Sequence, residues 1–177
     1  RVGLGPDLLP MVPELVRVVV AVDPATTHGD DSDWTGLAVA GVARNGDVYV
    51  LHISAQKTSP QTWASRAIAL YDEFGADEVV YESNQGGDLV RDAIRAAGGR
   101  RDIRISSVHA KVGKRIRAEP VVMLYEQGRA HHVGSFAAAE EQMCQFPVVH
   151  DHDDMVDALV HAVTGARKRR RGRVRTH

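Results

Sequence analysis

Four carboxylates in this sequence stand at the ends of expected secondary-structure elements. Asp23 closes a β-branched run that is typical of a buried strand, and Glu82 closes a second, shorter apolar run. Asp154 and Asp157 open an apolar helix, and their three-residue spacing places both on one helical face. Ligands bind at such strand ends in open α/β sheets, so the acids should meet in one crevice if the two strands are parallel neighbours.

The chemistry that such a cluster favours is metal-assisted hydrolysis. Clustered carboxylates repel one another unless cations lie between them. Hard oxygen ligands favour Mg²⁺ or Mn²⁺ over zinc, and two such ions roughly 4 Å apart can activate a water and stabilise the leaving oxygen of a phosphodiester. We expect Asp23 to bridge both ions, with Glu82 and the helix acids holding one each, so that the protein needs no nucleophile of its own.

Each acid also has an ordinary structural interpretation. Asp23 precedes Pro24 and could begin a turn, and Glu82 could be a solvated residue at a strand end. Asp154 could cap its helix, while Asp157 could be a first-turn acid favoured by the helix dipole. Their joint placement, at element ends that one sheet topology would bring together, favours the metal site.

The elements that must position these acids follow a simple order. Three strands come first, at Val16–Val22, Thr35–Ala43 and Asp47–Ser54, and the Arg-Asn-Gly between the last two is typical of a hairpin turn. Further strands are expected at residues 78–82, 103–108 and 130–133, and helices at residues 60–74, 86–97, 114–127, 136–145 and 154–166. This order predicts an α/β fold with a mixed sheet of five or more strands, antiparallel over the first three and parallel at the fourth and fifth, with helices on both faces.

Composition and charge divide the chain of 177 residues into three parts. Residues 1–14 carry three prolines and two glycines and are interpreted as a linker remnant, residues 15–166 as one folded domain, and residues 167–177 as a basic, disordered tail. Seven basic residues fall between Arg167 and Arg175, which leaves 15 basic against 23 acidic residues elsewhere. An acidic body suits carboxylates that hold cations, and the tail could bind phosphates.

Other features bear on location. The single cysteine, Cys144, cannot form an internal disulfide, and no apolar run approaches the roughly 20 residues of a membrane helix. The sequence also lacks a signal-peptide pattern at its start. We therefore expect a cytoplasmic protein without a membrane partner.

Three segments form a recognisable set: Val-Ala-Val-Asp-Pro-Ala (20–25), Val-Val-Tyr-Glu-Ser-Asn-Gln-Gly-Gly (79–87) and His-Asp-Asp-Met-Val-Asp-Ala-Leu-Val-His-Ala (152–162). With the loop at residues 30–36 and the stretch at 114–128, they resemble the nuclease domain of phage terminase large subunits, which belongs to the ribonuclease H-like superfamily. Those proteins are the DNA-packaging motors of tailed phages. The resemblance extends from about Leu15 to Ala166, which implies that residues 15–166 are a ribonuclease H-like nuclease domain, located in the host cell cytoplasm if a phage encodes it.

The resemblance implies a ribonuclease H-like fold and a two-ion endonuclease that uses Mg²⁺ or Mn²⁺. The substrate would be double-stranded DNA, cut with little sequence preference when concatemers are resolved during packaging. Asp23 and Glu82 match the first two metal-binding acids of the family. The third matches Asp157 or Asp154, because related enzymes place ligands at both positions, and we favour Asp157.

The family also implies partners. Its members carry an ATPase domain ahead of the nuclease and act with a portal and a small terminase subunit. This sequence has no Gly-x-x-x-x-Gly-Lys-Ser/Thr loop, so we expect the nuclease part only, without ATP hydrolysis. Four basic residues could hold the DNA backbone from a helix near the crevice, although an ordinary solvated face explains them equally well: Lys111, Lys114, Arg115 and Arg117.

Three alternatives remain open. A Holliday-junction resolvase of the same superfamily shares the Asp, Glu and Asp-x-x-Asp layout. A DNA-binding module could keep the fold without useful activity in isolation. An actin-like ATPase also begins with a strand ending in Asp, but the second Asp-Gly phosphate hairpin is missing. The sequence has neither the Cys and His spacing of a zinc site nor a Gly-x-Ser-x-Gly hydrolase elbow.

Overall fold

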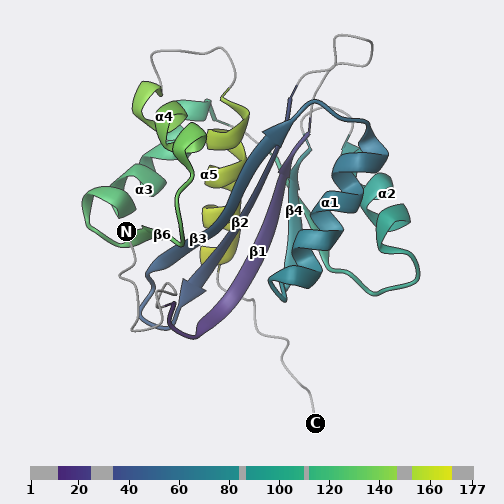
Figure 1. Cartoon of the computed structure of the whole chain (residues 1–177), viewed down its shortest axis with the longest axis horizontal. Coiled ribbons are helices and arrows are strands. Elements are labelled where there is room, and N and C mark those ends of the chain that lie inside the picture. The colour runs from purple at the N-terminus through teal and green to yellow at the C-terminus, as the bar shows by residue number, and fades with distance from the viewer. Residues whose placement is uncertain (1–11, 25–33, 84–86, 110–111, 147–152, 169–177) are drawn as a thin grey trace.

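The computed structural model describes residues 12–24, 34–83, 87–109, 112–146 and 153–168, which form a six-stranded sheet between two layers of helices (Figure 1). The strands are β1 (Leu15–Asp23), β2 (Thr35–Ala43), β3 (Val48–Gln56), β4 (Glu78–Glu82), β5 (Ile105–Val108) and β6 (Ala130–His132). The helices are α1 (Pro60–Glu73), α2 (Gly87–Gly98), α3 (Lys114–Glu126), α4 (Ala137–Gln145) and α5 (Asp154–Arg167).

The strand order across the sheet is β5-β4-β1-β2-β3-β6. β2 is antiparallel to both β1 and β3, whereas β1, β4 and β5 run parallel to one another. This confirms the predicted mixed ribonuclease H-like sheet, and β6 adds a short edge strand parallel to β3. The predicted hairpin between β2 and β3 turns at Gly46, whose φ of 86° lies in the left-handed region that favours glycine.

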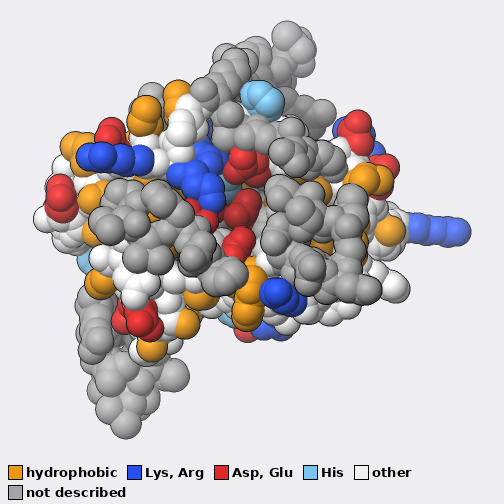
Figure 2. Space-filling model, turned by 90° about the horizontal axis from the view of Figure 1, so that it is seen from above, with side chains coloured by type: hydrophobic (Ala, Val, Ile, Leu, Met, Phe, Trp, Pro, Cys, Tyr) orange, Lys and Arg blue, Asp and Glu red, His pale blue; other side chains and the backbone are white. Residues whose placement is uncertain are grey.

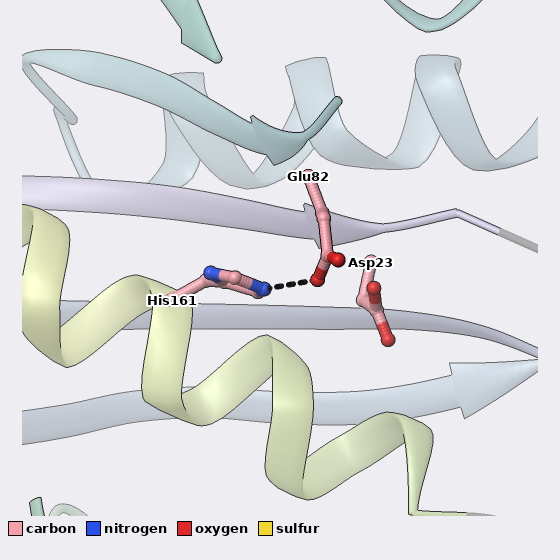
Figure 3. A group of neighbouring side chains, drawn as sticks. All are labelled: Asp23, Glu82 and His161. Atoms are coloured by element: carbon pink, nitrogen blue, oxygen red, sulfur yellow. Dashed lines mark hydrogen bonds and ion pairs between the residues drawn. The ribbon is translucent and has the colours of Figure 1, made fainter. Parts of the chain in front are cut away.

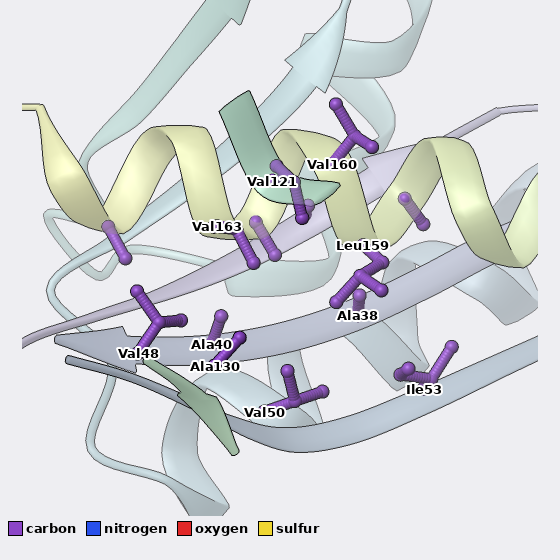
Figure 4. Close-up of a cluster of buried hydrophobic side chains, with 14 of the residues drawn as sticks. Ala38, Ala40, Val48, Val50, Ile53, Val121, Ala130, Leu159, Val160 and Val163 are labelled. Carbon is purple, nitrogen blue, oxygen red and sulfur yellow. The ribbon is translucent and has the colours of Figure 1, made fainter. Parts of the chain in front are cut away.

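The central strand β1 is apolar along its length because helices cover both faces of the sheet. Val19 and Ala21 face a cluster formed with α3, α4 and α5, while Val18, Val20 and Val22 face one formed with α1 and α2. Figure 4 shows how α5 lies across the sheet on the first of these faces. The central strands are thereby fixed between the layers, and their ends are fixed with them.

The observed elements lie within two residues of the predicted bounds. Ser59 caps α1, since its Oγ accepts a hydrogen bond from the Thr62 amide at 3.3 Å, and Pro60 occupies the first helical position. α3 runs without a break through Pro120.

The interpreted linker (1–14) and basic tail (167–177) lie almost entirely outside the described residues. Among the helices that the structure describes, none has the length and apolar character needed to cross a membrane.

Candidate metal centre

The first two acids lie at the same level of the sheet because β1 and β4 are parallel. The register pairs Val22 with Tyr81, so the residues that follow, Asp23 and Glu82, end neighbouring strands side by side. Both carboxylates are partly buried. The open end of the two strands thus presents two acids to the same space.

The first turn of α5 approaches this strand end closely because Gly36 has no side chain. Gly36 pairs with Asp23 across β1 and β2, and a Cβ atom added to Gly36 would lie 2.2 Å from the carbonyl oxygen of Asp154. Asp157, on the same turn, is only 5% exposed. Asp154 is partly buried and lies close enough for its charge to act on Asp23.

His161 adds a nitrogen to the group. It lies one helical turn after Asp157, is 2% exposed, and places its Nε2 atom 2.9 Å from Glu82 Oε2 (Figure 3). Asp23, Glu82 and His161 each offer one ligand atom, and these three atoms lie within 4.8 Å of one another. Carboxylate oxygens and imidazole nitrogens are common ligands of divalent ions, so the residues present fit a metal centre.

Two basic residues of α3 pair with these acids. Lys114 Nζ lies 2.6 Å from both Asp153 Oδ1 and Asp157 Oδ2. Arg117 Nη1 lies 2.7 Å from Glu82 Oε2, and its Nη2 lies 3.7 Å from Asp157 Oδ1. Seen from above, acidic side chains gather at the centre of this end of the molecule with Lys and Arg beside them (Figure 2). The protein's own cations therefore screen the cluster.

The pKa values of the acids diverge with their surroundings. Burial, followed by the neighbouring carboxylates, raises the pKa of Asp23 well above its ordinary value. The hydrogen bond with His161, aided by Arg117, instead lowers the pKa of Glu82 to about 2. Burial also raises the pKa of Asp157, although its Lys114 partner opposes this shift. Asp23 is the carboxylate whose charge gains most from an added cation.

The four basic residues predicted to contact DNA lie in different places. Lys114 and Arg117 face the acids, where they form the ion pairs described above. Arg115 is exposed on α3, and Lys111 lies outside the described residues. Their contact with DNA remains a prediction.

Sequence reasoning missed two residues that the structure places here. Asp153, just before α5, binds Lys114, and His161 contacts Glu82. The available signal for His161 was its spacing, since it follows Asp157 by four residues on the same helical face and is polar within an apolar run. His150 and His152, which precede Asp154 in the sequence, lie outside the described residues.

Three solved structures illustrate the likeness in fold. The large terminase nuclease of thermophilic phage G20c, with bound zinc, is 17% identical over 89% of this chain and 86% of its own, with a TM-score of 0.63. The nuclease of the bacteriophage Sf6 large terminase subunit, with calcium, is 16% identical over 86% and 89%, with a TM-score of 0.59. RuvC from T. thermophilus, in complex with a Holliday junction, is 21% identical over 84% and 92%, with a TM-score of 0.50. At these identities the likeness concerns the fold.

Sequence comparison with curated proteins found no match. The family model described as the terminase RNaseH-like domain, in contrast, matches residues 20–165, a span that includes Asp23, Glu82 and Asp157. Because that match covers most of the chain, this protein belongs to the terminase RNaseH-like domain family.

Proposed function

We propose that this chain is a metal-dependent endonuclease that hydrolyses double-stranded DNA with little sequence preference. It would cut concatemeric phage DNA as the nuclease part of a terminase large subunit, with an ATPase domain ahead of it and a portal and small subunit as partners. The observation that carries the proposal is the meeting of Asp23, Glu82 and Asp157 at one end of the sheet. The family match supports it.

The proposed cofactors are two Mg²⁺ or Mn²⁺ ions held by Asp23, Glu82, Asp157 and Asp154. Bound there, such ions supply an activated water and stabilisation of the leaving oxygen. The G20c nuclease has been solved with magnesium and the Sf6 nuclease with manganese, which supports this choice. Asp23 ends β1, which lies between β4 with Glu82 and β2, where α5 approaches at Gly36, so its carboxylate would help to hold both ions.

The basic residues of α3 have a second role in this proposal. Lys114 and Arg117 form ion pairs with Asp157 and Glu82 and so offset part of the charge of the cluster. Once an ion takes over that task, their donors are available for the phosphate oxygens of the DNA backbone, with Arg115 on the exposed side of the helix. These groups would then orient the strand over the acids.

A plasmid-nicking assay tests the proposal. In Mn²⁺ the chain should convert supercoiled plasmid to nicked and linear forms, and a chelator should stop the reaction. Asp23→Ala and Glu82→Ala should each slow cleavage more than about 100-fold, since even residues that only support a metal ligand change activity 10- to 100-fold. Asp88→Ala is the matched control, because that α2 side chain is 88% exposed. If the unaltered protein, Asp23→Ala, Glu82→Ala and Asp88→Ala all gave the same rate, these acids would not catalyse cleavage, and the chain would be a binding module without nuclease activity.

A four-way junction resolvase is the second candidate, favoured by the fold shared with RuvC. Such an enzyme should cut four-way junctions far faster than linear duplex of the same sequence. Comparable rates on the two substrates would support the packaging nuclease.

A further inference from the structure

Three side chains meet at one end of the site. Arg117 Nη1 lies 2.7 Å from Glu82 Oε2 and 3.3 Å from His161 Nε2, while that nitrogen and that oxygen are 2.9 Å apart. A carboxylate only accepts hydrogen bonds, so the 2.9 Å contact is one that His161 Nε2–H donates to Glu82. A hydrogen and a guanidinium thus lie against a carboxylate oxygen and a ring nitrogen that could both bind a metal ion.

The neutral tautomer of His161 with its hydrogen on Nδ1 leaves the Nε2 lone pair free to ligate a metal in place of this hydrogen bond. Ligand atoms of one ion, each at about 2.1 Å, can lie up to about 4.2 Å apart, so the group of atoms within 4.8 Å must close by about 0.6 Å at most. Figure 3 shows the imidazole directed at the Glu82 carboxylate, with Asp23 on the other side of that carboxylate. Burial of His161 at 2% exposure holds the ring in this orientation.

Arg117 has space to withdraw. A cavity of about 480 Å³ between α3 and α5 is lined by Arg117 and His161, with mostly apolar walls that include Val121, Leu124 and Val160. The guanidinium Nε atom is buried and finds no hydrogen-bond partner among the described residues, so its present position leaves one donor unsatisfied. The cavity can accommodate the aliphatic part of the side chain while the guanidinium turns toward solvent or a DNA phosphate, which leaves Glu82 and His161 free to ligate an ion.

We propose that His161 supplies a nitrogen ligand to the ion held by Asp23 and Glu82, so that this position takes a first-row transition ion in preference to Mg²⁺. The inference rests on the proposed function and specifies its cofactor. Imidazole favours transition ions, whereas sites made only of carboxylate, carbonyl and water oxygens suit Mg²⁺. A site made only of the four acids assigned from the sequence would not favour a transition ion over Mg²⁺, because all its ligand atoms would be oxygens.

Pulsed electron paramagnetic resonance of bound Mn²⁺ tests the ligand directly. The 177-residue chain with Mn²⁺ should show coupling to a directly bound ¹⁴N nucleus, and labelling its histidines with ¹⁵N should replace that signal without altering the fold. His161→Gln should abolish the coupling and weaken Mn²⁺ binding on the order of tenfold, with a smaller effect on Mg²⁺. His52→Gln is the matched control, since His52 bonds Ser54 on β3.

Absence of ¹⁴N coupling in the unaltered protein would overturn the inference, as would His161→Gln binding both ions with unchanged affinity. Asp23→Ala separates this failure from failure of the proposed function. If Asp23→Ala no longer binds Mn²⁺ or nicks plasmid while His161→Gln does both normally, the proposed nuclease function is supported and the nitrogen ligand is ruled out. If the unaltered protein binds no Mn²⁺ and does not nick DNA, both proposals fall.

Discussion

At the scale of single residues, the carboxylates of the site differ in what their charge does to the fold. Asp23 is buried beside other acids, and its raised pKa shows that the folded protein disfavours its ionised form. Glu82 has the opposite pKa shift because His161 and Arg117 stabilise its charge. The charge of Glu82 is therefore already offset by its neighbours, whereas the charge of Asp23 is not. A bound cation would stabilise the ionised form of Asp23.

Asp23→Asn should consequently stabilise the metal-free protein at neutral pH. For an acid whose pKa is raised on folding, the charged form opposes folding at every pH above the unfolded value near 3.8, and the penalty disappears as pH falls below it. We expect the melting temperature in chelator to rise by a few degrees at pH 7, since 1 kcal/mol corresponds to about 2–4 °C for a chain of this size.

That gain should vanish near pH 3, where Asp23 is protonated in both states. Asp88→Asn, on the exposed face of α2, should change neither value. Excess Mn²⁺ should reverse the order at pH 7, because a ligand stabilises only the protein that binds it. If the melting temperature of Asp23→Asn in chelator at pH 7 were equal to or lower than that of the unaltered protein, the proposed unfavourable charge on Asp23 would be contradicted.

At the scale of elements, the sequence predicted the parts that follow from local patterns. β1 and β4 were expected from apolar runs that end in acids. Their parallel pairing was only a condition of the predicted site, because β2, β3 and α1 lie between them in the sequence, and the structure shows that pairing. The contact of α3 with the acids was not predictable, because Lys114 and Asp153 are 39 residues apart and no local pattern links them. The same holds for His161 and Glu82, 79 residues apart.

The close approach of α5 to β2 gives a prediction for Gly36. In Gly36→Ala the added methyl group would meet the Asp154 carbonyl, so the first turn of α5 must shift and carry Asp154 and Asp157 with it. Overpacking of this kind typically destabilises by about 1–3 kcal/mol. Denaturant unfolding should show that loss, and the plasmid assay should show slower cleavage.

Gly113→Ala is the comparison, because a Cβ atom at Gly113 meets no atom within 4 Å. If Gly36→Ala cut DNA and unfolded like the unaltered protein, the position of α5 would not depend on this contact.

At the scale of the whole molecule, charge is divided between an acidic body and a basic C-terminal segment. Outside Arg167–Arg175 the chain has 15 basic and 23 acidic residues, so the net charge of the body does not attract DNA. Deleting residues 169–177 removes five arginines. We expect weaker binding to duplex DNA. The plot of the logarithm of the binding constant against the logarithm of the salt concentration should also become shallower, by up to about 0.9 for each phosphate that the shortened chain no longer neutralises.

Fluorescence anisotropy with a labelled duplex, measured over a range of salt concentrations, would give both values. Plasmid nicking at low salt should persist in the truncated chain, since none of the acids is removed. An unchanged slope would show that the segment contacts no phosphate and that basic residues within residues 1–168 account for binding.

The most direct measurement of the central claim is anomalous diffraction from crystals soaked in Mn²⁺. We expect two Mn²⁺ peaks roughly 4 Å apart, both in contact with Asp23. One should lie beside Glu82 and His161, and the other beside Asp157 and Asp154. Arg117 and Lys114 should have left their positions against the acids. Saturating Mn²⁺ that gives no peak at these carboxylates, with both ion pairs intact, would contradict the assignment of this cluster as a metal centre.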